Sequence, residues 1–406
     1  MKTVSKVVCL LATVFILSFF PEIGRAADYN VSTSLDFTGP LASVSKSLNA
    51  GESVFFQWWN ETRGSKLGII LHRKAFDSRY DPSVISSLWP GILASDKPIA
   101  HFGMGMADVA ALIARLPNDK VPLFNSTSAY GILWAPNLWA FQFRATYAHD
   151  IASFLNWARK TLIKDRPVRF ANITSKAAAF VEMVDQLEGF AKGADWVEFV
   201  GVEYVDPKPV SIISEIRRLA RKNPDFIVIT SNTAHVIAAI KAQQELGIHI
   251  PLIMGTHTGI QMSTQAAGDI KLFEGHYDVY SVDPGIDMNV PGARIFNEYK
   301  KKMGIEQNWD VVIVQEAARM ALFGRAVERA AAKVGANKIT GEAIYQAMFE
   351  GPFTREEMLG LTDTIMFSKE AAFPLKGLRY RIATVKNGKQ VLATEDWIPM
   401  VEIKKF

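Results

Sequence analysis

The sequence predicts an α/β fold made of two doubly wound parallel-sheet lobes. From residue 28 onward, short apolar segments alternate with helical patterns, which is the order of βα units that build parallel sheets. The chain has 406 residues, 49% of them hydrophobic and 21% charged, as is typical of folded globular proteins. Because one doubly wound unit normally stops near about 200 residues, a chain of this length divides best into two lobes.

The first 26 residues are expected to be a secretory signal peptide. Lys2 and Lys6 precede an apolar stretch over residues 7–20, and Gly24-Arg25-Ala26 supplies the small residues of a cleavage site. The stretch is shorter than the roughly 20 residues that span a bilayer, which favours export over a membrane anchor. Cleavage near Ala26 would remove Cys9, the one cysteine. We therefore expect an exported protein that folds without disulfide bonds.

The first part of the chain alternates strands and helices. Each predicted strand is a short apolar run bounded by turn residues, and each predicted helix has an apolar period of 3.6 residues. The strands are predicted over Val31–Leu35, Lys66–His72, Pro98–Phe102 and Pro122–Asn125. The helices are predicted over Ser43–Asn60, Pro82–Leu93, Asp108–Leu116 and His149–Lys164.

The same alternation continues up to about residue 254. Strands are predicted over Val168–Asn172, Trp196–Tyr204, Phe226–Thr230 and Pro251–Met254. Helices are predicted over Ala177–Lys192, Val210–Lys222 and His235–Leu246. The uninterrupted apolar run at Phe226–Thr230 is typical of a strand buried on both faces.

Beyond Asp283 the pattern becomes mostly helical and then closes with a hairpin. Helices are predicted over Ala293–Lys302, Val311–Lys333 and Gly341–Glu350. The last strands, Tyr380–Lys386 and Gln390–Thr394, flank Asn387-Gly388. That dipeptide is a strong signal for a two-residue hairpin turn.

Several functional classes are disfavoured. The 45 basic and 41 acidic residues are spread without a run of five like charges, whereas a nucleic-acid footprint needs clustered positive charge. None of the seven histidines forms an i, i+4 pair with acid support, so we expect no metal site. The sequence also lacks a Gly-x-Ser-x-Gly elbow, a phosphate loop and paired catalytic carboxylates. We expect neither enzymatic activity nor a cofactor.

Three loops that follow predicted strands are candidate binding segments. They are Thr38–Ala42, Gly103–Asp108 and Asn125–Tyr130. Backbone N–H groups at a helix start, aided by hydroxyl groups, can hold a carboxylate. The glycines are equally consistent with plain turns, and the hydroxyl run with helix capping. Trp134 and Trp139 follow the third loop, where they either pack in the core or stack on a ligand.

Motifs in a fixed order along the chain resemble the branched-chain amino acid type of periplasmic solute-binding proteins. In chain order they are Gly39-Pro40-Leu41-Ala42, Asp81-Pro82, Lys120-Val121-Pro122-Leu123, Phe143-Arg144-Ala145, Asn223-Pro224-Asp225-Phe226 and Met254-Gly255-Thr256-His257. Each motif is weak alone, but their order over more than 200 residues is specific.

The resemblance implies a type I binding fold in which two lobes, joined by three crossovers, close on a small solute. Lobe 1 is expected over residues 27–146 plus 281–367, and lobe 2 over 147–280 plus 368–406. The protein would be a monomer that delivers its solute to membrane permease subunits with an associated ATPase. The alternative is a ligand-sensing module that feeds a signalling receptor.

The resemblance also implies the binding residues. The serine of amino-acid-binding members is Ala107 here, and their threonine falls at or beside Ala129. The tyrosine and glutamate that hold the substrate ammonium map near Asn232 or Thr233 and onto His257. The expected ligand contacts are Tyr80, Met106, Ala107, Thr127, Ser128, Ala129, Tyr130, Trp134, Phe180, Asn232, Thr233 and His257.

Histidine in place of that glutamate leaves two ligand classes open. A buried ammonium without a carboxylate partner would lose several kcal/mol, whereas histidine suits a carboxylate, carbonyl or hydroxyl group. The first hypothesis is a hydrophobic amino acid, which would require an acidic group from another loop. The second is an aromatic or aliphatic carboxylate, or a related amide, with Val44 in place of a family aromatic residue giving room for a larger body.

Overall fold

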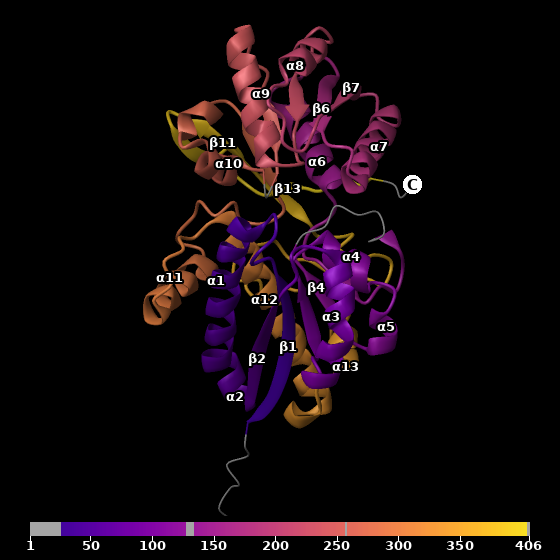
Figure 1. The fold of residues 1–406 in the computed structure, drawn as a ribbon, viewed down its shortest axis with the longest axis vertical. Helices are drawn as coiled ribbons and strands as arrows, with labels where there is room; N and C mark the ends of the chain where they lie inside the picture. Colours follow the sequence, from indigo (N-terminus) through magenta and orange to yellow (C-terminus); the bar gives the residue numbers. More distant parts are fainter. Residues whose placement is uncertain (1–25, 127–133, 256–257, 404–406) are drawn as a thin grey trace, which may run out of the picture.

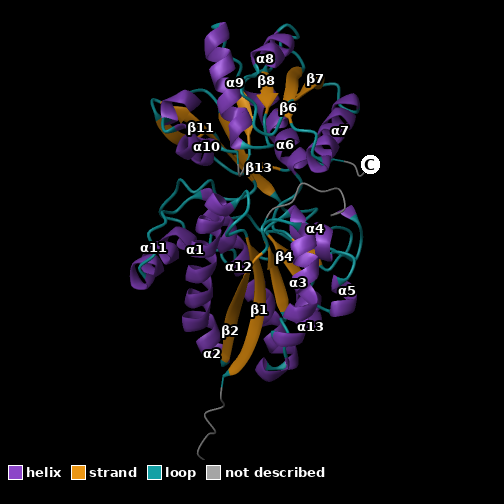
Figure 2. Ribbon diagram, in the orientation of Figure 1, coloured by secondary structure: helices purple, strands orange, loops and turns teal. Residues whose placement is uncertain are grey.

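A computed structural model describes residues 26–126, 134–255 and 258–403. Two lobes lie one above the other (Figure 1), and helices flank the strands of both (Figure 2). The predicted pair of α/β lobes is thus confirmed. The predicted signal peptide lies outside the described residues, except for its last residue, Ala26.

The first sheet is entirely parallel, with the strand order β2-β1-β3-β4-β5. Its strands are β1 (Ala27–Leu35), β2 (Ile69–Asp77), β3 (Ala100–Gly103), β4 (Leu123–Asn125) and β5 (Ala140–Phe141). The helices between them are α1 (Ala42–Trp59), α2 (Ser65–Leu67), α3 (Pro82–Ser95), α4 (Met106–Leu112) and α5 (Leu116–Asp119). These strands run from the foot of the lower lobe towards the upper lobe (Figure 2).

The expected strand at Lys66–His72 is wrong in its first residues. A π-helical turn at Asn60–Gly64 continues the chain from α1 into α2, so residues 65–67 are helical. Gly68 ends this helix in the left-handed conformation, with φ of +66°, which glycine adopts at little cost. The strand therefore begins only at Ile69.

Three later helices return to the first lobe. They are α11 (Pro291–Met303), α12 (Val311–Val334) and α13 (Gly341–Ala347). In Figure 1, α11 and α12, in orange, lie beside the indigo α1, and α13 packs against α12. A Cβ atom at Gly324 would lie 2.6 Å from the indole of Trp59, so a glycine here lets α12 approach α1 closely. The first core therefore combines residues from both ends of the sequence.

The second sheet has the order β12-β11-β10-β9-β8-β6-β7, and it is parallel from β7 to β10. The parallel strands are β6 (Val168–Thr174), β7 (Val197–Tyr204), β8 (Phe226–Val228), β9 (Leu252–Met254) and β10 (Tyr277–Tyr280). The antiparallel strands are β11 (Arg379–Lys386) and β12 (Lys389–Leu392), with the short β13 (Ile398–Pro399) paired to β11. The predicted Asn387-Gly388 hairpin is confirmed, since both residues have positive φ.

Helices cover both faces of this second sheet. They are α6 (Tyr147–Thr161), α7 (Ala178–Lys192), α8 (Ile213–Ala220), α9 (Thr233–Leu246) and α10 (Ile260–Ala267). Val168 and Phe170 of β6 pack with α6 and α7, whereas Ala171 and Ile173 pack with α8 and α9. This alternation is the two-residue period of a strand buried on both faces.

In the described part of the chain, three segments cross between the lobes: residues 142–146, 281–290 and 368–378. The first and third lie side by side, since the backbone N–H group of Gln142 donates to the Ala372 carbonyl at 2.9 Å. Because α6 leads away from the crossing at 142–146 and β6 returns, the carboxyl end of β6 points back to the lobe boundary. The strand ends of both sheets therefore face each other.

Candidate functional site between the lobes

The loop between β1 and α1 folds around Asp36. This buried carboxylate accepts hydrogen bonds from the backbone N–H groups of Gly39 (2.5 Å) and Leu41 (2.6 Å). A Cβ atom at Gly39 would lie 2.5 Å from Asp36 Oδ1 and 2.6 Å from the Arg79 carbonyl oxygen, so only glycine fits. Both N–H groups therefore point inward to the protein's own carboxylate.

The loop between β3 and α4 is built in the same way around Asp108. Its carboxylate accepts from the N–H groups of Met104 (2.8 Å) and Gly105 (3.1 Å), from the Ser34 hydroxyl and from His101 Nε2 (3.2 Å). All of these groups are buried. The sequence suggested that backbone N–H groups of this loop could hold a ligand carboxylate. Two of them, at Met104 and Gly105, instead donate to the protein's own Asp108 carboxylate.

Two predicted contacts, Tyr80 and Met106, meet at this loop. The Met106 N–H group donates to the Tyr80 hydroxyl at 3.3 Å, and the Met106 side chain reaches the core of the second lobe. Burial raises the pKa of Tyr80 further above its ordinary value, so its hydroxyl stays neutral. Ala107 is buried beside them.

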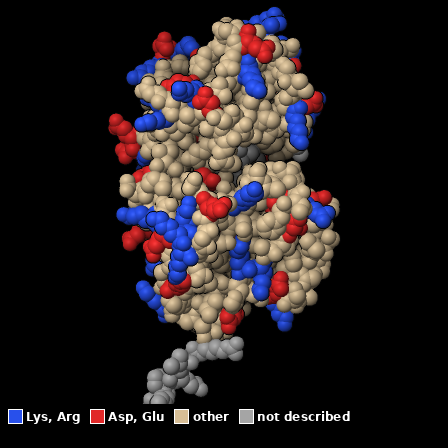
Figure 3. Space-filling model, turned by 60° about the vertical axis from the view of Figure 1, so that its left-hand side comes forward, with Lys and Arg blue, Asp and Glu red and all other residues tan. Residues whose placement is uncertain are grey.

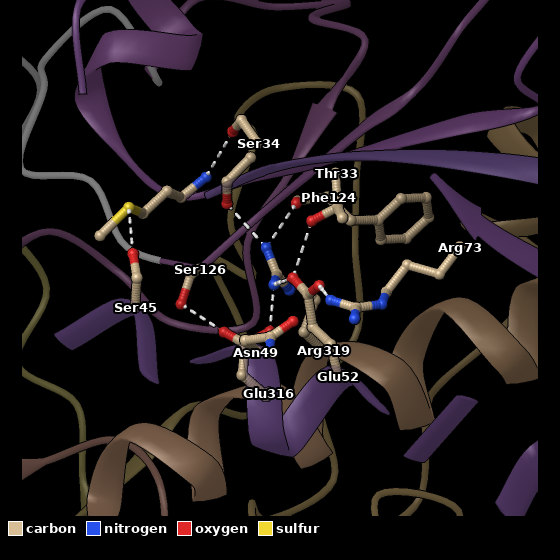
Figure 4. Close-up of polar contacts among 12 residues, drawn as sticks. Thr33, Ser34, Ser45, Asn49, Glu52, Arg73, Phe124, Ser126, Glu316 and Arg319 are labelled. Atoms are coloured by element: carbon tan, nitrogen blue, oxygen red, sulfur yellow. Dashed lines mark hydrogen bonds and ion pairs between the residues drawn. The ribbon is translucent and has the colours of Figure 1, made fainter. Parts of the chain in front are cut away.

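A buried ionic network lies beside the carboxyl ends of β3 and β4 in this lobe (Figure 4). Arg319 of α12 lies between Glu52 and Glu316 and donates to both carboxylates. It also donates to the Gly103 carbonyl at 2.7 Å, and Ser126 donates to Glu316 at 2.9 Å. The ends of β3 and β4 are therefore fixed to α12. Burial raises the pKa of Glu316, while the Arg319 charge opposes that shift.

On the second lobe, the side chain of Asn232 makes two hydrogen bonds that shape its own loop. Its side-chain oxygen caps α9 by accepting from the His235 N–H group at 3.0 Å, and its amide nitrogen donates to the Pro207 carbonyl at 3.0 Å. Thr233 is the half-buried first residue of α9. Phe180, in the first turn of α7, packs against the core beneath α6 and α7.

Trp134 packs between α6 and the crossing segment 368–378. Its ring stacks on His149 of α6 at a centroid distance of 5.2 Å and meets Phe373 edge-on at 5.0 Å. Burial lowers the pKa of His149 to about 3, so the stacked imidazole is neutral. Trp139 instead stacks on Tyr345 at 4.3 Å within the first lobe. Both rings therefore pack against other aromatic side chains of the protein, and these contacts give no evidence that either ring stacks on a ligand.

The remaining predicted contacts cannot be placed. Thr127, Ser128, Ala129, Tyr130 and His257 lie outside the described residues. The segments that carry them follow Ser126 at the end of β4 and Gly255 at the end of β9.

Sequence reasoning missed a direct contact between the lobes at Gln261 of α10. Its amide nitrogen donates to the Pro284 carbonyl at 3.1 Å, and its oxygen accepts from the Val311 N–H group at the start of α12 at 2.9 Å. The helix was not predicted because Gln261–Ala267 carries too few apolar residues to show a helical period. No signal in the sequence pairs it with Val311, 50 positions away.

Positive and negative side chains are mixed on the face of the molecule drawn in the space-filling view. On the face in Figure 3, Lys and Arg side chains are interspersed with Asp and Glu over both lobes. Within the described residues, no cluster of three or more potential metal-ligating side chains occurs. No described helix combines the length and the hydropathy needed to cross a membrane.

A family model described as periplasmic binding protein matches residues 29–389. The chain therefore belongs to the periplasmic binding protein family, as the motif order predicted, and its two lobes have the type I fold.

Solved structures agree with this assignment at the level of the fold. The chain is similar to a branched-chain amino acid ABC transporter protein from Thermus thermophilus with bound valine (TM-score 0.76, 18% identity, 91% of this chain and 96% of that chain). It is also similar to a solute-binding protein from R. palustris in complex with benzoate (0.70, 17%, 92% and 98%). A third is a fatty acid ABC transporter substrate-binding protein from Thermomonospora curvata (0.72, 16%, 90% and 91%). No curated protein matches the sequence.

Proposed function

We propose that this protein is the substrate-binding subunit of an ABC importer, which captures a small hydrophobic solute between its lobes and presents it to membrane permease subunits. The observation that carries this proposal is the family match over residues 29–389, on a chain with two sheets whose strand ends face one another. Ligands in open α/β folds bind outside the carboxyl ends of strands, and closure of two lobes excludes water from the bound solute. Binding without catalysis follows from this role.

A signal peptide cleaved near Ala26 would deliver a monomeric protein to the periplasm. The proposed lobes are 27–146 plus 281–367 and 147–280 plus 368–406, which places the crossings between them. The separate cores of the two lobes support this division, except that Ala371, Ala372, Phe373 and Leu378 of the third crossing pack in the core of lobe 1.

The solute is proposed to be a hydrophobic amino acid or an aromatic or aliphatic carboxylate. Similar structures hold valine in one case and benzoate in another. The contacts would come from Tyr80, Met106, Ala107, Phe180, Asn232 and Thr233, together with the segments that carry Thr127, Ser128, Ala129, Tyr130, Trp134 and His257.

Native mass spectrometry of the purified protein, followed by thermal-shift titration, tests this function. A solute at 100 times its Kd should stabilise the protein by about 2.7 kcal/mol. The panel comprises leucine, valine, benzoate and octanoate. We expect one chemical class to raise Tm and the others to leave it unchanged.

His257→Ala should weaken binding of the stabilising solute without lowering the Tm of the free protein. His249→Ala, a change at another histidine of the second lobe, is the control. Failure of every solute in the panel, with no co-purified small molecule, would contradict the proposed function. Unchanged affinity in His257→Ala would remove that residue from the site.

A further inference from the structure

A cavity of about 710 Å³ opens at the carboxyl edge of the second sheet. One wall is the loop between β6 and α7, at residues 175–177, and the other is the loop between β7 and α8, at residues 205–212. The side chains around it include Ser175, Lys176, Tyr204 and Lys208. The cavity therefore lies where ligands bind in folds of this kind.

Ser175 is the first sign that this cavity takes a ligand. The residue is 6% exposed and lines the cavity. Among the described residues, its hydroxyl has no hydrogen-bond partner, whereas Ser126 donates to Glu316 and Ser231 pairs with His235. The hydroxyl reaches the solvent of the cavity, so water satisfies it in the free protein and a polar group of a bound molecule can take the place of that water.

The second sign is the start of α7, which borders the same cavity. Its N-cap residue is Ala177, no side chain caps the helix, and no acidic residue lies in its first turn. The first N–H groups of a helix have no partner within the helix, and the helix dipole favours a negative charge there. By contrast, Asn232 caps α9 and Asp310 caps α12.

Charged side chains of both signs border the cavity. Lys176 and Lys208 are exposed and stand on opposite walls. Of the two carboxylates at the cavity, Glu215 pairs with Arg218 at 2.8 Å, and Asp206 is exposed to solvent. The lining is therefore close to neutral, and the two lysines can offset the charge of a bound anion.

This cavity adjoins the site proposed above. Asn232 donates to the Pro207 carbonyl, and His235 pairs with the Asp206 carbonyl at 2.7 Å, so one wall of the cavity is fixed to the loop between β8 and α9. Phe180 lies in the first turn of α7. A solute bound beside Asn232 and Phe180 can thus extend into the cavity.

The first lobe offers fewer anion donors than the sequence suggested. Asp36 occupies the N–H groups of Gly39 and Leu41, and Asp108 occupies those of Met104 and Gly105. Resting on the proposed function, we infer that the solute carries a carboxylate and that this group binds in the second lobe, on Ser175 and the start of α7.

Isothermal titration calorimetry with benzoate and octanoate tests the inference, with benzamide and octanamide as neutral probes. Ser175→Ala should weaken binding of the carboxylate that the protein accepts by about ten-fold. Ala177→Asp should weaken it at least as much, because an aspartate at this N-cap would occupy the same N–H groups. Since Ala177 has the extended backbone of an N-cap (φ −66°, ψ 138°), Ala177→Asp should not lower Tm.

Ser65→Ala, at an exposed serine of the first lobe, is the matched control and should bind like the wild type. Carboxylate affinity unchanged in both Ser175→Ala and Ala177→Asp would overturn the inference and leave the proposed function standing. Equal affinity of the wild type for an acid and its amide would also overturn it. A wild type that binds an amide but neither acid would contradict the inference alone, whereas no binding of any probe would contradict both.

Discussion

Asp278 shows how one buried acid couples the stability of this protein to pH. Its carboxyl group is fully buried on β10. It accepts hydrogen bonds from the Ile260 N–H group at 2.9 Å, the Tyr280 hydroxyl at 2.8 Å and Gln390 Nε2 at 3.2 Å. Burial raises its pKa to about 7, although the bonds from Ile260 and Tyr280 oppose the shift. The folded protein therefore holds a proton that the unfolded chain releases near pH 4.

The sign of the resulting pH dependence follows from linkage. The contribution of Asp278 to stability is complete below about pH 4 and is lost as pH rises through about 7. Asp278→Asn should therefore raise the free energy of unfolding at pH 8 and change it little at pH 4.5. Urea unfolding across this range measures the effect, with the exposed Asp396→Asn as the control. An identical pH slope in Asp278→Asn and the wild type would contradict the assignment.

At the scale of elements, α10 links the two lobes. Asp278 fixes its first N–H group, at Ile260, and the next residue, Gln261, bonds to both Pro284 and Val311. Val311 is the first residue of α12, so its N–H group would otherwise lack a partner. The side chain of Met262 also packs against the first core. This helix therefore favours the arrangement in which the lobes are in contact.

Gln261→Ala should shift the free protein towards a more open form. The expected result is a larger radius of gyration in small-angle X-ray scattering and a several-fold faster dissociation of bound solute, since each lost hydrogen bond costs about 1 kcal/mol. Gln265→Ala, at an exposed position of the same helix, is the matched control. An unchanged radius and dissociation rate in Gln261→Ala would show that this contact does not hold the lobes together.

At the scale of the whole molecule, the first lobe depends on α12. This helix is buried along most of its length and supplies Phe323, which meets Phe102 and Phe124 of the sheet edge-on at 5.2 and 5.1 Å. Arg319 on the same helix neutralises Glu52. Without α12 the sheet would expose its core and leave a buried carboxylate short of its main partner.

A chain that ends at residue 303 tests this dependence. It keeps every strand of the first sheet but lacks α12 and α13, together with the strands β11, β12 and β13 of the second lobe, so only the first lobe is compared. We expect rapid proteolysis within residues 27–141 and no cooperative unfolding transition for that lobe in calorimetry. Protection equal to that of the full chain would contradict the expected role of α12. A full-length Lys333→Met variant, which removes only an exposed pair with Glu350, should unfold cooperatively.

The fold could largely be predicted from the sequence because strand and helix periods are local. Elements whose signal is short or interrupted were missed: β5 has only two residues, and Asp278 divides the apolar run of β10. The hydrogen bonds that Asp36 and Asp108 accept from their own loops could have been predicted from the sequence, since these residues lie only three positions from Gly39 and Gly105. In contrast, the Gln261–Val311 and Arg319–Glu52 contacts join distant segments, and no local pattern announces them.

The interleaving of the two lobes along the chain has a consequence for biosynthesis. A ribosome makes β1–β5 long before it makes α12, so the apolar side chains of the first sheet would stay uncovered while most of the polypeptide is still being synthesised. Folding of the first lobe is thereby delayed until α12 has been made, and a holding chaperone would find exposed apolar segments over much of the nascent chain. Such a polypeptide would reach an export channel still able to thread through it.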